Sequence, residues 1–327
     1  MQGMRNVSLL IVCPIVILCG GTKIFTPPTA KERTDAIGPL MYLPPTLRAA
    51  FEDSTDFDPI PAPGSNDWLA VHNEPGQTFD QFVQSNPNRP DSTRTTIYLL
   101  PLGEFPKEQS ALIDQLKTYA SAYFAMKVLV LPMVNLNDFH LTTRINSTSH
   151  TRQILSTDVL DRLKSRLPSN AFCLLAITME DLYPEPSWNF VFGEASLQER
   201  VGVYSFLRYD PAFYGAERGP DYLNCILRRS AQVFVHETGH MFGLEHCIHF
   251  RCVMNGSNHL AESDSQPLHL CPVCLRKLQH SIGFDVLARE RELRRFYQTV
   301  GFNEEARWTA KRIDKLVNAA KREDGQQ

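Results

Sequence analysis

The sequence predicts a mixed α/β (α+β) fold, in which helices pack on a mixed β-sheet. Segments with strand character alternate with amphipathic segments from residue 95 onward. Residues 171–179 are almost wholly apolar, which suits a central strand that is buried on both faces. The order strand, helix, strand, helix and then several strands is typical of a sheet that helices cover.

Each element is predicted from its own pattern. Strands are expected where short runs are apolar, β-branched or aromatic, at 95–100, 128–133, 171–179, 189–192 and 201–207. Helices are expected where apolar residues recur three or four positions apart, at 107–125, 154–167 and 224–242. Ser156 and Thr157 are candidate caps for the second of these helices.

The composition is that of an ordinary globular chain. Of 327 residues, 43% are hydrophobic and 21% are charged, so the chain can bury a large core without disulfides. This composition excludes collagen, a coiled-coil rod and a wholly disordered chain. The net charge is −3 and there is no basic stripe. We therefore expect no nucleic-acid partner and no attraction to an anionic membrane.

The chain divides into four predicted segments. They are 1–21, a signal peptide or a disordered start; 22–92, a proline-rich N-terminal arm; 93–285, the strongly patterned body; and 286–327, a charged C-terminal helical tail. We expect the arm to pack on the body and to contain one short helix near 78–83. The charged run from Arg289 to Arg295 is predicted to be a solvated helix face.

The first segment leaves two interpretations open. It has one basic residue, Arg5, an apolar run over 7–19 that is too short to span a bilayer, and small residues at Gly20 and Gly21. These are features of a signal peptide, but Pro14 interrupts the run, and a disordered start explains the residues equally well. The cellular location stays open for the same reason. No later apolar stretch predicts a stable membrane span.

The segment 236–246 has the spacing of a metal site. His236 and His240 are four residues apart on a predicted helix, about 40° around its axis, so both rings project from one face. Such a pair can bind one tetrahedral Zn²⁺ through the two Nε2 atoms. Gly243 takes the left-handed conformation at little cost, so the helix can end there. The chain can then turn back and bring His246 to the same ion.

The residue after the first histidine suggests hydrolysis. The carboxylate of Glu237 can flank the open coordination position without filling it. Three protein ligands leave a fourth position for water, whose pKa zinc lowers toward about 7. Glu237 would then be the general base that accepts the proton of this water and passes it to the leaving amine.

Four of the eight cysteines lie in the stretch 247–274, which follows this segment. They are Cys247, Cys252, Cys271 and Cys274. Cys-x-x-Cys is a common half-site for structural zinc, and the first two cysteines can supply the other half. Two disulfides are the alternative, which gains weight if the chain is secreted. Because Cys247 directly follows His246, a metal held by the cysteines would also help to fix that histidine.

The motif HExxHxxGxxH over residues 236–246 resembles that of the metzincin zinc peptidases. The residues around it resemble the archaemetzincin family in particular. They are the cysteines at 247 and 252, Met254, the block 256–260, the pair at 271 and 274, and the upstream segments 181–184 and 188–193. The resemblance covers about 95–283, with little in the arm or in the last forty residues.

The resemblance implies a zincin-like fold with a catalytic zinc bound by His236, His240 and His246, and with Glu237 as the general base. It also implies a methionine turn at Met254 beneath the metal, and a structural zinc held by the four cysteines. Two zinc ions per chain follow from it. The substrates that it implies are peptides or proteins, and the location that it implies is intracellular.

Three other functions stay open at this point. The same residues would serve a zinc hydrolase of another amide, a catalytically silent zinc-binding protein, or a Cys/His module that binds nucleic acid. Glu237 argues against the second, and the acidic net charge argues against the third. Four further histidines nearby are predicted to be surface or supporting groups, at 249, 259, 269 and 280. Asn146 and Asn255 match the glycosylation acceptor pattern, and a glycan on Asn255 would disrupt the site.

Overall fold

The structure is a computed structural model that describes residues 25–52 and 55–324. The predicted signal peptide or disordered start at 1–21 lies outside the described residues. In the described part of the chain, no helix combines the length and the apolar character that crossing a membrane requires.

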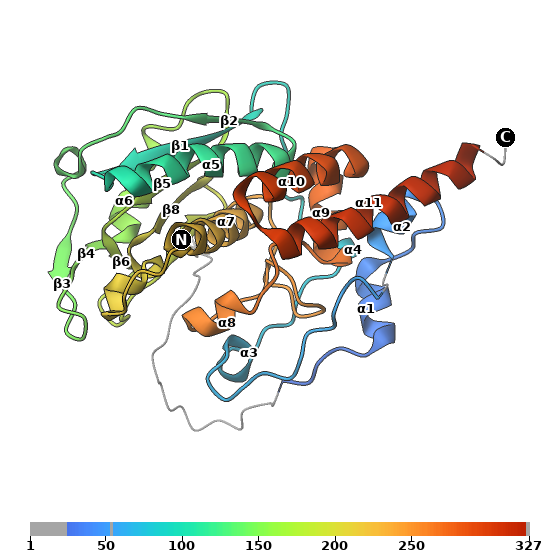
Figure 1. Cartoon of the computed structure of the whole chain (residues 1–327), viewed down its shortest axis with the longest axis horizontal. Coiled ribbons are helices and arrows are strands. Elements are labelled where there is room, and N and C mark those ends of the chain that lie inside the picture. The colour runs from blue at the N-terminus through green and yellow to red at the C-terminus, as the bar shows by residue number, and fades with distance from the viewer. Residues whose placement is uncertain (1–24, 53–54, 325–327) are drawn as a thin grey trace, which may run out of the picture.

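A five-stranded sheet forms the centre of the fold, and its strands lie in the order β2-β1-β5-β8-β7 (Figure 1). The strands are β1 Thr96–Leu102, β2 Lys127–Val130, β5 Ala171–Thr178, β7 Gly193–Ser196 and β8 Val201–Ser205. Four of them are parallel, and β7 runs antiparallel to β8 at one edge. The predicted mixed α/β fold is therefore confirmed.

Helices cover both faces of this sheet. Helices α5 (Lys107–Phe124) and α7 (Tyr222–Met241) pack on one face, and α6 (Ser156–Lys164) packs on the other. Successive residues of β5 alternate between the two cores, Leu175 with α5 and α7 and Leu174 with α6. All positions of β5 are buried, which explains its continuous apolar sequence.

A second, smaller sheet has the order β3-β4-β6 and was not predicted. Its strands are β3 Thr143–Ile145, β4 Arg152–Leu155 and β6 Asp181–Tyr183. Strand β4 takes the first two residues of the helix predicted at 154–167, so α6 begins only at Ser156. The strand predicted at 189–192 is wrong. In this segment Val191 makes only an isolated bridge to Leu182, and regular pairing begins at β7.

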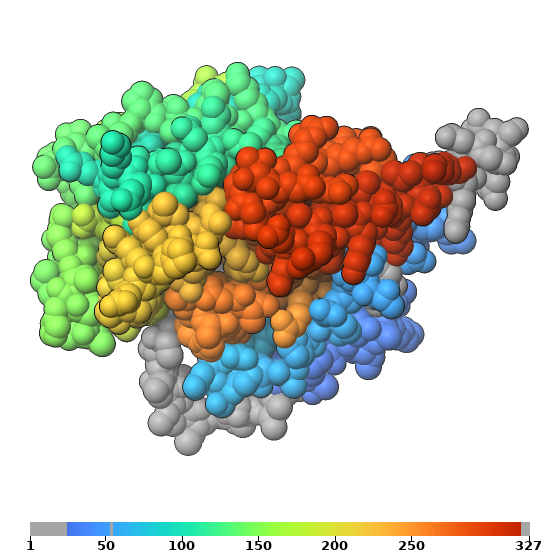
Figure 2. Space-filling view, viewed as in Figure 1, coloured from blue at the N-terminus to red at the C-terminus, as the bar shows by residue number. Residues whose placement is uncertain are grey.

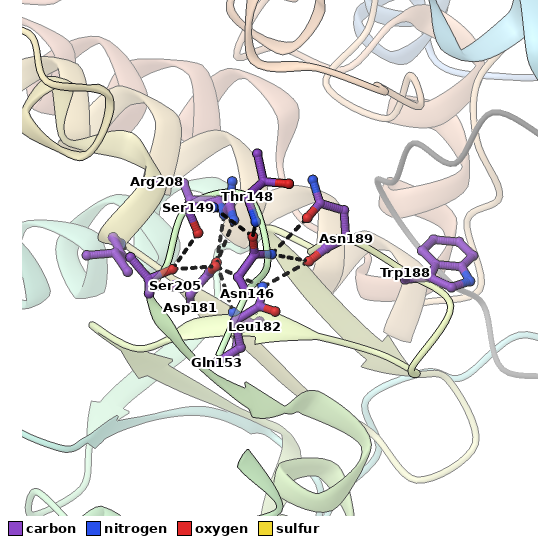
Figure 3. Close-up of polar contacts among 12 residues, drawn as sticks. Asn146, Thr148, Ser149, Gln153, Asp181, Leu182, Trp188, Asn189, Ser205 and Arg208 are labelled. Atoms are coloured by element: carbon purple, nitrogen blue, oxygen red, sulfur yellow. Dashed lines mark hydrogen bonds and ion pairs between the residues drawn. The ribbon is translucent and has the colours of Figure 1, made fainter. Parts of the chain in front are cut away.

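In the segment 189–192, side chains form hydrogen bonds with the backbone in place of a neighbouring strand (Figure 3). The carbonyl of Asn189 accepts hydrogen bonds from Asn146 Nδ2 and Gln153 Nε2, each at 2.9 Å. Gln153 also donates to Asp181 at 2.8 Å, and Arg208 donates to both oxygens of Asp181 at 2.6 and 2.7 Å. This network fixes the segment that leads into β7, and it explains why the apolar pattern there does not form a strand.

The N-terminal arm lies against the C-terminal helices, as the blue surface beneath the orange and red surfaces shows in Figure 2. Its helices are α1 Ala30–Ile37, α2 Pro45–Phe51, α3 Trp68–Val71 and α4 Phe79–Gln84. The last of these confirms the short helix predicted near 78–83. Arg276 donates a hydrogen bond to the carbonyl of Ile37, and Trp308 Nε1 donates to the carbonyl of Asp56 at 3.0 Å.

The C-terminal part consists of helices that join the core. They are α8 Leu260–Asp264, α9 Pro272–Ile282, α10 Val286–Val300 and α11 Asn303–Asp324. The prediction of a solvated face is wrong for Arg289 and Glu290, which are buried as an ion pair at 2.8 Å. Arg289 also donates to the carbonyl of Tyr123 on α5 at 2.6 Å. One core cluster contains side chains from Ala36 to Leu316. The boundaries of the four predicted segments stay predictions.

Candidate metal centres

The structure brings the three predicted histidines together at the end of α7. The rings of His236 and His240 are 4.7 Å apart between centroids, and the ring of His246 lies 5.3 and 5.2 Å from them. One nitrogen from each ring lies within 4.8 Å of the other two. All three residues are buried. The geometry therefore places three potential ligands around a single point.

Hydrogen bonds determine which nitrogen of each ring is free. His236 Nδ1 lies 2.8 Å from the carbonyl of Val253, and His240 Nδ1 lies 2.6 Å from the carbonyl of Leu244. A carbonyl only accepts, so both Nδ1 atoms carry the proton and both Nε2 atoms carry the lone pair. His246 has the same arrangement, because its Nδ1 lies 2.6 Å from a carboxylate oxygen of Glu74.

The free nitrogens fit a metal ion. Nε2 of His236 and Nε2 of His240 are 3.1 Å apart, close to the separation of about 3.3 Å that two nitrogens take on one tetrahedral zinc. With the proton on Nδ1, two lone pairs face each other across this gap. Nε2 of His246 is buried without a hydrogen-bond partner among the described residues. Burial, together with the smaller effect of the neighbouring His246, lowers the pKa of His236 to about 3.

Gly243 makes the turn that returns the third histidine. Its φ of +85° lies in the left-handed region, which a residue with a Cβ adopts only at a cost. The amide of Gly243 donates to the carbonyl of His240 at 2.7 Å, and the amide of Leu244 donates to the carbonyl of Gly239 at 3.1 Å. The helix thus ends where the sequence predicts, and the chain reverses toward the metal site.

The side chain of Glu237 lies between α7, which carries it, and the edge strand β7. Its side chain is fully buried, and neither carboxylate oxygen has a hydrogen-bond partner in the described part of the chain. A Cβ on Gly193 would lie 3.1 Å from Oε1 of Glu237 and 2.9 Å from Cβ of Tyr204. The absence of a side chain at Gly193 therefore admits the carboxylate. Burial raises the pKa of Glu237 well above its ordinary value, and the buried Glu194 raises it further.

Met254 lies directly beneath the catalytic helix. It is fully buried, and a Cβ on Gly239 would lie 2.6 Å from its Sδ. The glycine in the second half of the motif thus lets the methionine approach the helix backbone. The residue before it, Val253, is the one whose carbonyl fixes His236. Met254 therefore lies next to the residue whose carbonyl orients His236, a predicted metal ligand, while the methionine turn stays a prediction.

The four predicted cysteines form a second cluster. Their Sγ atoms all lie within 4.8 Å of one another, and all four are buried free thiols. None of the described cysteines forms a disulfide. Sγ of Cys252 accepts backbone N–H bonds from Cys271 at 3.2 Å and from Met254 at 3.5 Å. Burial opposes ionisation of Cys247, but hydrogen bonds from the other three thiols hold its pKa well below the usual range.

Hydrogen bonds link the histidine cluster to the cysteine cluster. The amide of Cys247, which follows His246, donates to the carbonyl of Met254 at 2.8 Å. Asn255 clamps this loop, because its Nδ2 donates to the carbonyls of Cys247 at 2.7 Å and Phe250 at 2.9 Å. Asn255 is buried by these contacts, and Asn146 is buried in the network of Figure 3. Neither glycosylation pattern is therefore accessible in the folded chain.

A cleft of about 240 Å³ opens beside the histidine cluster. Its lining includes His240 and His246 on one side, Leu197 from the turn between β7 and β8, and Pro75 and Gly76 from the arm. The arm therefore contributes to the surroundings of the site. Neither this contribution nor the role of Glu74 could be predicted from the sequence, because carboxylates in an irregular segment have no periodicity or spacing that marks them.

A third group of metal-binding residue types lies nearby, at Asp67, His259 and Glu262. Its hydrogen bonds are those of a helix cap. Nδ1 of His259 accepts from the amide of Glu262 at 3.1 Å, and Nε2 donates to Asp67 at 3.1 Å. The carboxylate of Glu262 accepts from the amides of Trp68 and Asn258. Both nitrogens of His259 are therefore engaged, as the prediction of a supporting role expects.

Comparisons with known proteins identify the family. A model of peptidase family M54 matches residues 133–280. Archaemetzincin-2 of Homo sapiens is 38% identical over 279 residues, which are 76% of this chain and 77% of that protein. This chain belongs to the archaemetzincin family. The resemblance of the motif and its neighbours is thereby confirmed, and so is the prediction of a zinc-dependent metallopeptidase with peptide or protein substrates.

Other members of the archaemetzincin family are also similar. Archaemetzincin-1 of Homo sapiens is 33% identical over 262 residues, which are 72% of this chain and 52% of that protein. A solved archaemetzincin from Methanopyrus kandleri is 28% identical with a TM-score of 0.46, and the match covers 59% of this chain and 97% of that one. A zinc-dependent peptidase from Methanocorpusculum labreanum is 25% identical with a TM-score of 0.47, covering 56% and 99%.

Proposed function

We propose that this chain hydrolyses peptide bonds at the histidine cluster, where His236, His240 and His246 hold a zinc ion and Glu237 moves the proton. One observation carries the proposal. Each of the three rings has its Nδ1–H hydrogen-bonded, so that three Nε2 lone pairs converge on one buried point beside a cleft. Three nitrogen ligands with a remaining open side are the donor set of a catalytic zinc site.

When bound, zinc supplies a Lewis acid that makes water nucleophilic and polarises a substrate carbonyl. Glu237 supplies the base. Its carboxylate lies one residue from His236 on the same helix and is held against β7 at Gly193, and neither oxygen has a hydrogen-bond partner among the described residues. In the proposed reaction a carboxylate oxygen of Glu237 accepts the proton of the attacking water and then donates it to the leaving amine.

The edge of the main sheet is the proposed support for the substrate backbone. Strand β7 is the last strand of the sheet and touches the carboxylate of Glu237 through Gly193. An extended peptide can add to such an edge through main-chain hydrogen bonds. The segment 189–192 does not offer such an edge, because it is not a regular strand.

We also propose that Cys247, Cys252, Cys271 and Cys274 hold a second, structural zinc, which makes two ions per chain. Four buried thiols with Sγ atoms within 4.8 Å of one another are a closed donor set for tetrahedral zinc. The backbone N–H bonds to Sγ of Cys252 support a thiolate ligand, since they would stabilise its negative charge. Metal analysis of the purified protein should give two zinc ions per chain; a value of one with oxidised cysteines would exclude the second site.

The exchange Glu237→Gln tests the catalytic proposal. It keeps the size of the side chain and removes the base, so we expect hydrolysis of a peptide library, read by mass spectrometry, to fall by about 10²–10⁴-fold. Zinc content should stay at the wild-type value, because Glu237 is not a ligand. Glu199→Gln is the matched control, since Glu199 is exposed on the turn between β7 and β8. Turnover of Glu237→Gln equal to that of the control would remove Glu237 from the mechanism.

A further inference from the structure

The third histidine differs from the first two in what holds it. His236 and His240 donate Nδ1–H to backbone carbonyls that lie close to them in sequence, at Val253 and Leu244. His246 instead donates to the carboxylate of Glu74 at 2.6 Å, across a separation of 172 residues. Glu74 belongs to the irregular segment between α3 and α4 in the N-terminal arm. This segment lies outside residues 133–280, which the family model matches.

The carboxylate of Glu74 lies in a packed environment. Its second oxygen, Oε2, is buried without a hydrogen-bond partner among the described residues, and the side chain as a whole is 22% exposed. Trp68 covers the pair from one side, with its ring edge-on to His246 at 5.0 Å between centroids. Trp68 is itself seated on Gly256, where a Cβ would lie only 2.5 Å from its Cδ1. The partner of His246 is therefore part of a packed structure and not a mobile surface group.

The chain that follows Glu74 is fixed to both metal clusters. Nε2 of Gln77 donates to the carbonyl of Gly243 at 3.3 Å, and Oε1 of Gln77 accepts from the amide of Glu245 at 3.4 Å. Oε1 also accepts from Nζ of Lys277 at 2.9 Å, on the helix that carries the last cysteine. Gln77 therefore ties the arm to the two residues that flank Leu244 in the turn before His246.

A carboxylate on Nδ1 has two effects on a ligating imidazole. It keeps the proton on Nδ1, so the lone pair stays on Nε2, where the metal would lie. It also makes Nε2 more basic than a carbonyl partner does, because the negative charge stabilises a partial positive charge on the ring. A ring with neither effect rotates or changes tautomer, and it then presents an N–H to the metal.

We propose that Glu74 is a positioning residue for His246, and that the N-terminal arm thereby completes the catalytic metal centre. This inference rests on the proposed zinc site. Glu74 does not touch the ion. It selects the tautomer and the orientation of the third ligand, so its loss lowers the affinity for zinc and leaves the chemistry of Glu237 intact.

Zinc affinity of the purified holoenzyme tests the proposal. Zinc is withdrawn by a chromophoric chelator at a series of concentrations, and the two sites are separated by His246→Ala, which removes the histidine site. We expect Glu74→Ala to weaken the histidine site about 10–100-fold, the range seen for partners of metal-ligating histidines. Glu74→Gln retains an acceptor oxygen without the charge, so its loss should be smaller.

Glu245→Gln is the matched control for charge. Glu245 precedes His246, but its side chain is exposed and only its backbone amide is hydrogen-bonded to the arm. We expect its zinc affinity to equal that of the wild type. A loss as large as that of Glu74→Gln would show that general electrostatics, and not the contact with Nδ1, is responsible, and would overturn the proposal.

A spectroscopic reading separates positioning from loss of structure. In the wild-type holoenzyme the Nδ1–H proton of His246 should appear as a slowly exchanging, downfield resonance, and it should disappear in Glu74→Ala while those of His236 and His240 remain. If Glu74→Ala does not fold, Glu74→Gln decides on the same two measurements. Unchanged zinc affinity in the variant that folds overturns the role of Glu74. If His246→Ala releases zinc in the same way as the wild type, the proposed zinc site itself is overturned.

Discussion

The histidine cluster and the cysteine cluster are joined by the single peptide bond between His246 and Cys247, yet they differ in access. The histidines line a cleft of about 240 Å³. The four cysteines are between 0% and 3% exposed. Catalytic zinc sites keep an open position and structural sites are closed, so under the proposed function one short segment would carry ligands of both kinds. Both the donor type and the exposure of the cluster to solvent therefore change across the peptide bond between His246 and Cys247.

The two clusters also differ in where their support comes from. The cysteines and their hydrogen bonds lie within the segment 247–274, and Asn255 clamps that loop from inside it. The third histidine depends on Glu74, far away in sequence. A closed site can thus be built from local sequence, whereas the open site draws on the arm.

The largest effect is expected from removing one cysteine. Structural zinc contributes about 10–16 kcal/mol of apparent binding free energy in zinc-finger peptides, much of it as folding free energy. Cys271→Ser should therefore lower the melting temperature by more than ten degrees (about 4 kcal/mol or more). It should also weaken zinc binding at the histidines, because Cys247 is fixed by the same cluster.

His236→Ala should abolish hydrolysis and leave the cysteine zinc bound.

Calorimetry and zinc analysis of the two variants measure this asymmetry. Equal melting temperatures for Cys271→Ser and the wild type would show that the cysteine cluster does not support the fold. Loss of both zinc ions from His236→Ala would show that the dependence between the sites runs in both directions, contrary to the structural role assigned to the cysteines.

The same contrast explains what the sequence could predict. The motif over 236–246 and the cysteine spacing are local patterns, so the ligands, the turn at Gly243 and the helix that carries them follow from a few residue types. Four strands of the central sheet, β1, β2, β5 and β8, were predicted because they are largely apolar runs, whereas the edge strand β7 was not. Glu74 was not, because its contact spans 172 residues and leaves no periodic signal.

The errors have physical causes as well. The strand predicted at 189–192 has the right apolar residues, but the side chains of Asn146 and Gln153 bond to the carbonyl of Asn189. The charged run at Arg289 and Glu290 was predicted to be solvated, but this ion pair is buried and Arg289 donates to the carbonyl of Tyr123 on α5. In both cases a tertiary partner decides the outcome, and the local sequence does not contain that partner.

The next largest effect, on stability, is expected from protonation of Glu194, the buried carboxyl that raises the pKa of Glu237. Burial raises the pKa of this carboxyl from 4.5 to about 7, although the hydroxyl of Ser156, which donates to it at 2.5 Å, opposes the shift. Between these two values the folded chain holds a proton that the unfolded chain has released. Stability should therefore fall as the pH rises through this window, by about 3 kcal/mol for a shift of this size.

Urea unfolding of wild type and Glu194→Gln across pH 4.5–8 measures this slope. The variant should lack the decrease and should be the more stable of the two at pH 8, with Glu199→Gln as an exposed control that behaves as the wild type does. A wild-type stability that rises through the same window would have the wrong sign and would show that Glu194 is ionised in the folded chain.

The smallest effect is expected at Gly239, where the methionine turn meets the catalytic helix. Alanine has a higher helix propensity than glycine by about 1 kcal/mol, so on local grounds Gly239→Ala should stabilise α7. The added Cβ would lie 2.6 Å from Sδ of Met254, and overpacking of this kind typically costs about 1–3 kcal/mol. We therefore expect a net loss of about 1 kcal/mol, together with weaker zinc binding at the histidines and unchanged binding at the cysteines. A double-mutant cycle with Met254→Ala isolates the clash, because the shorter side chain makes room for the new Cβ. A coupling energy near zero would mean that the methionine does not press on the helix, and it would separate the turn from the support of the open site.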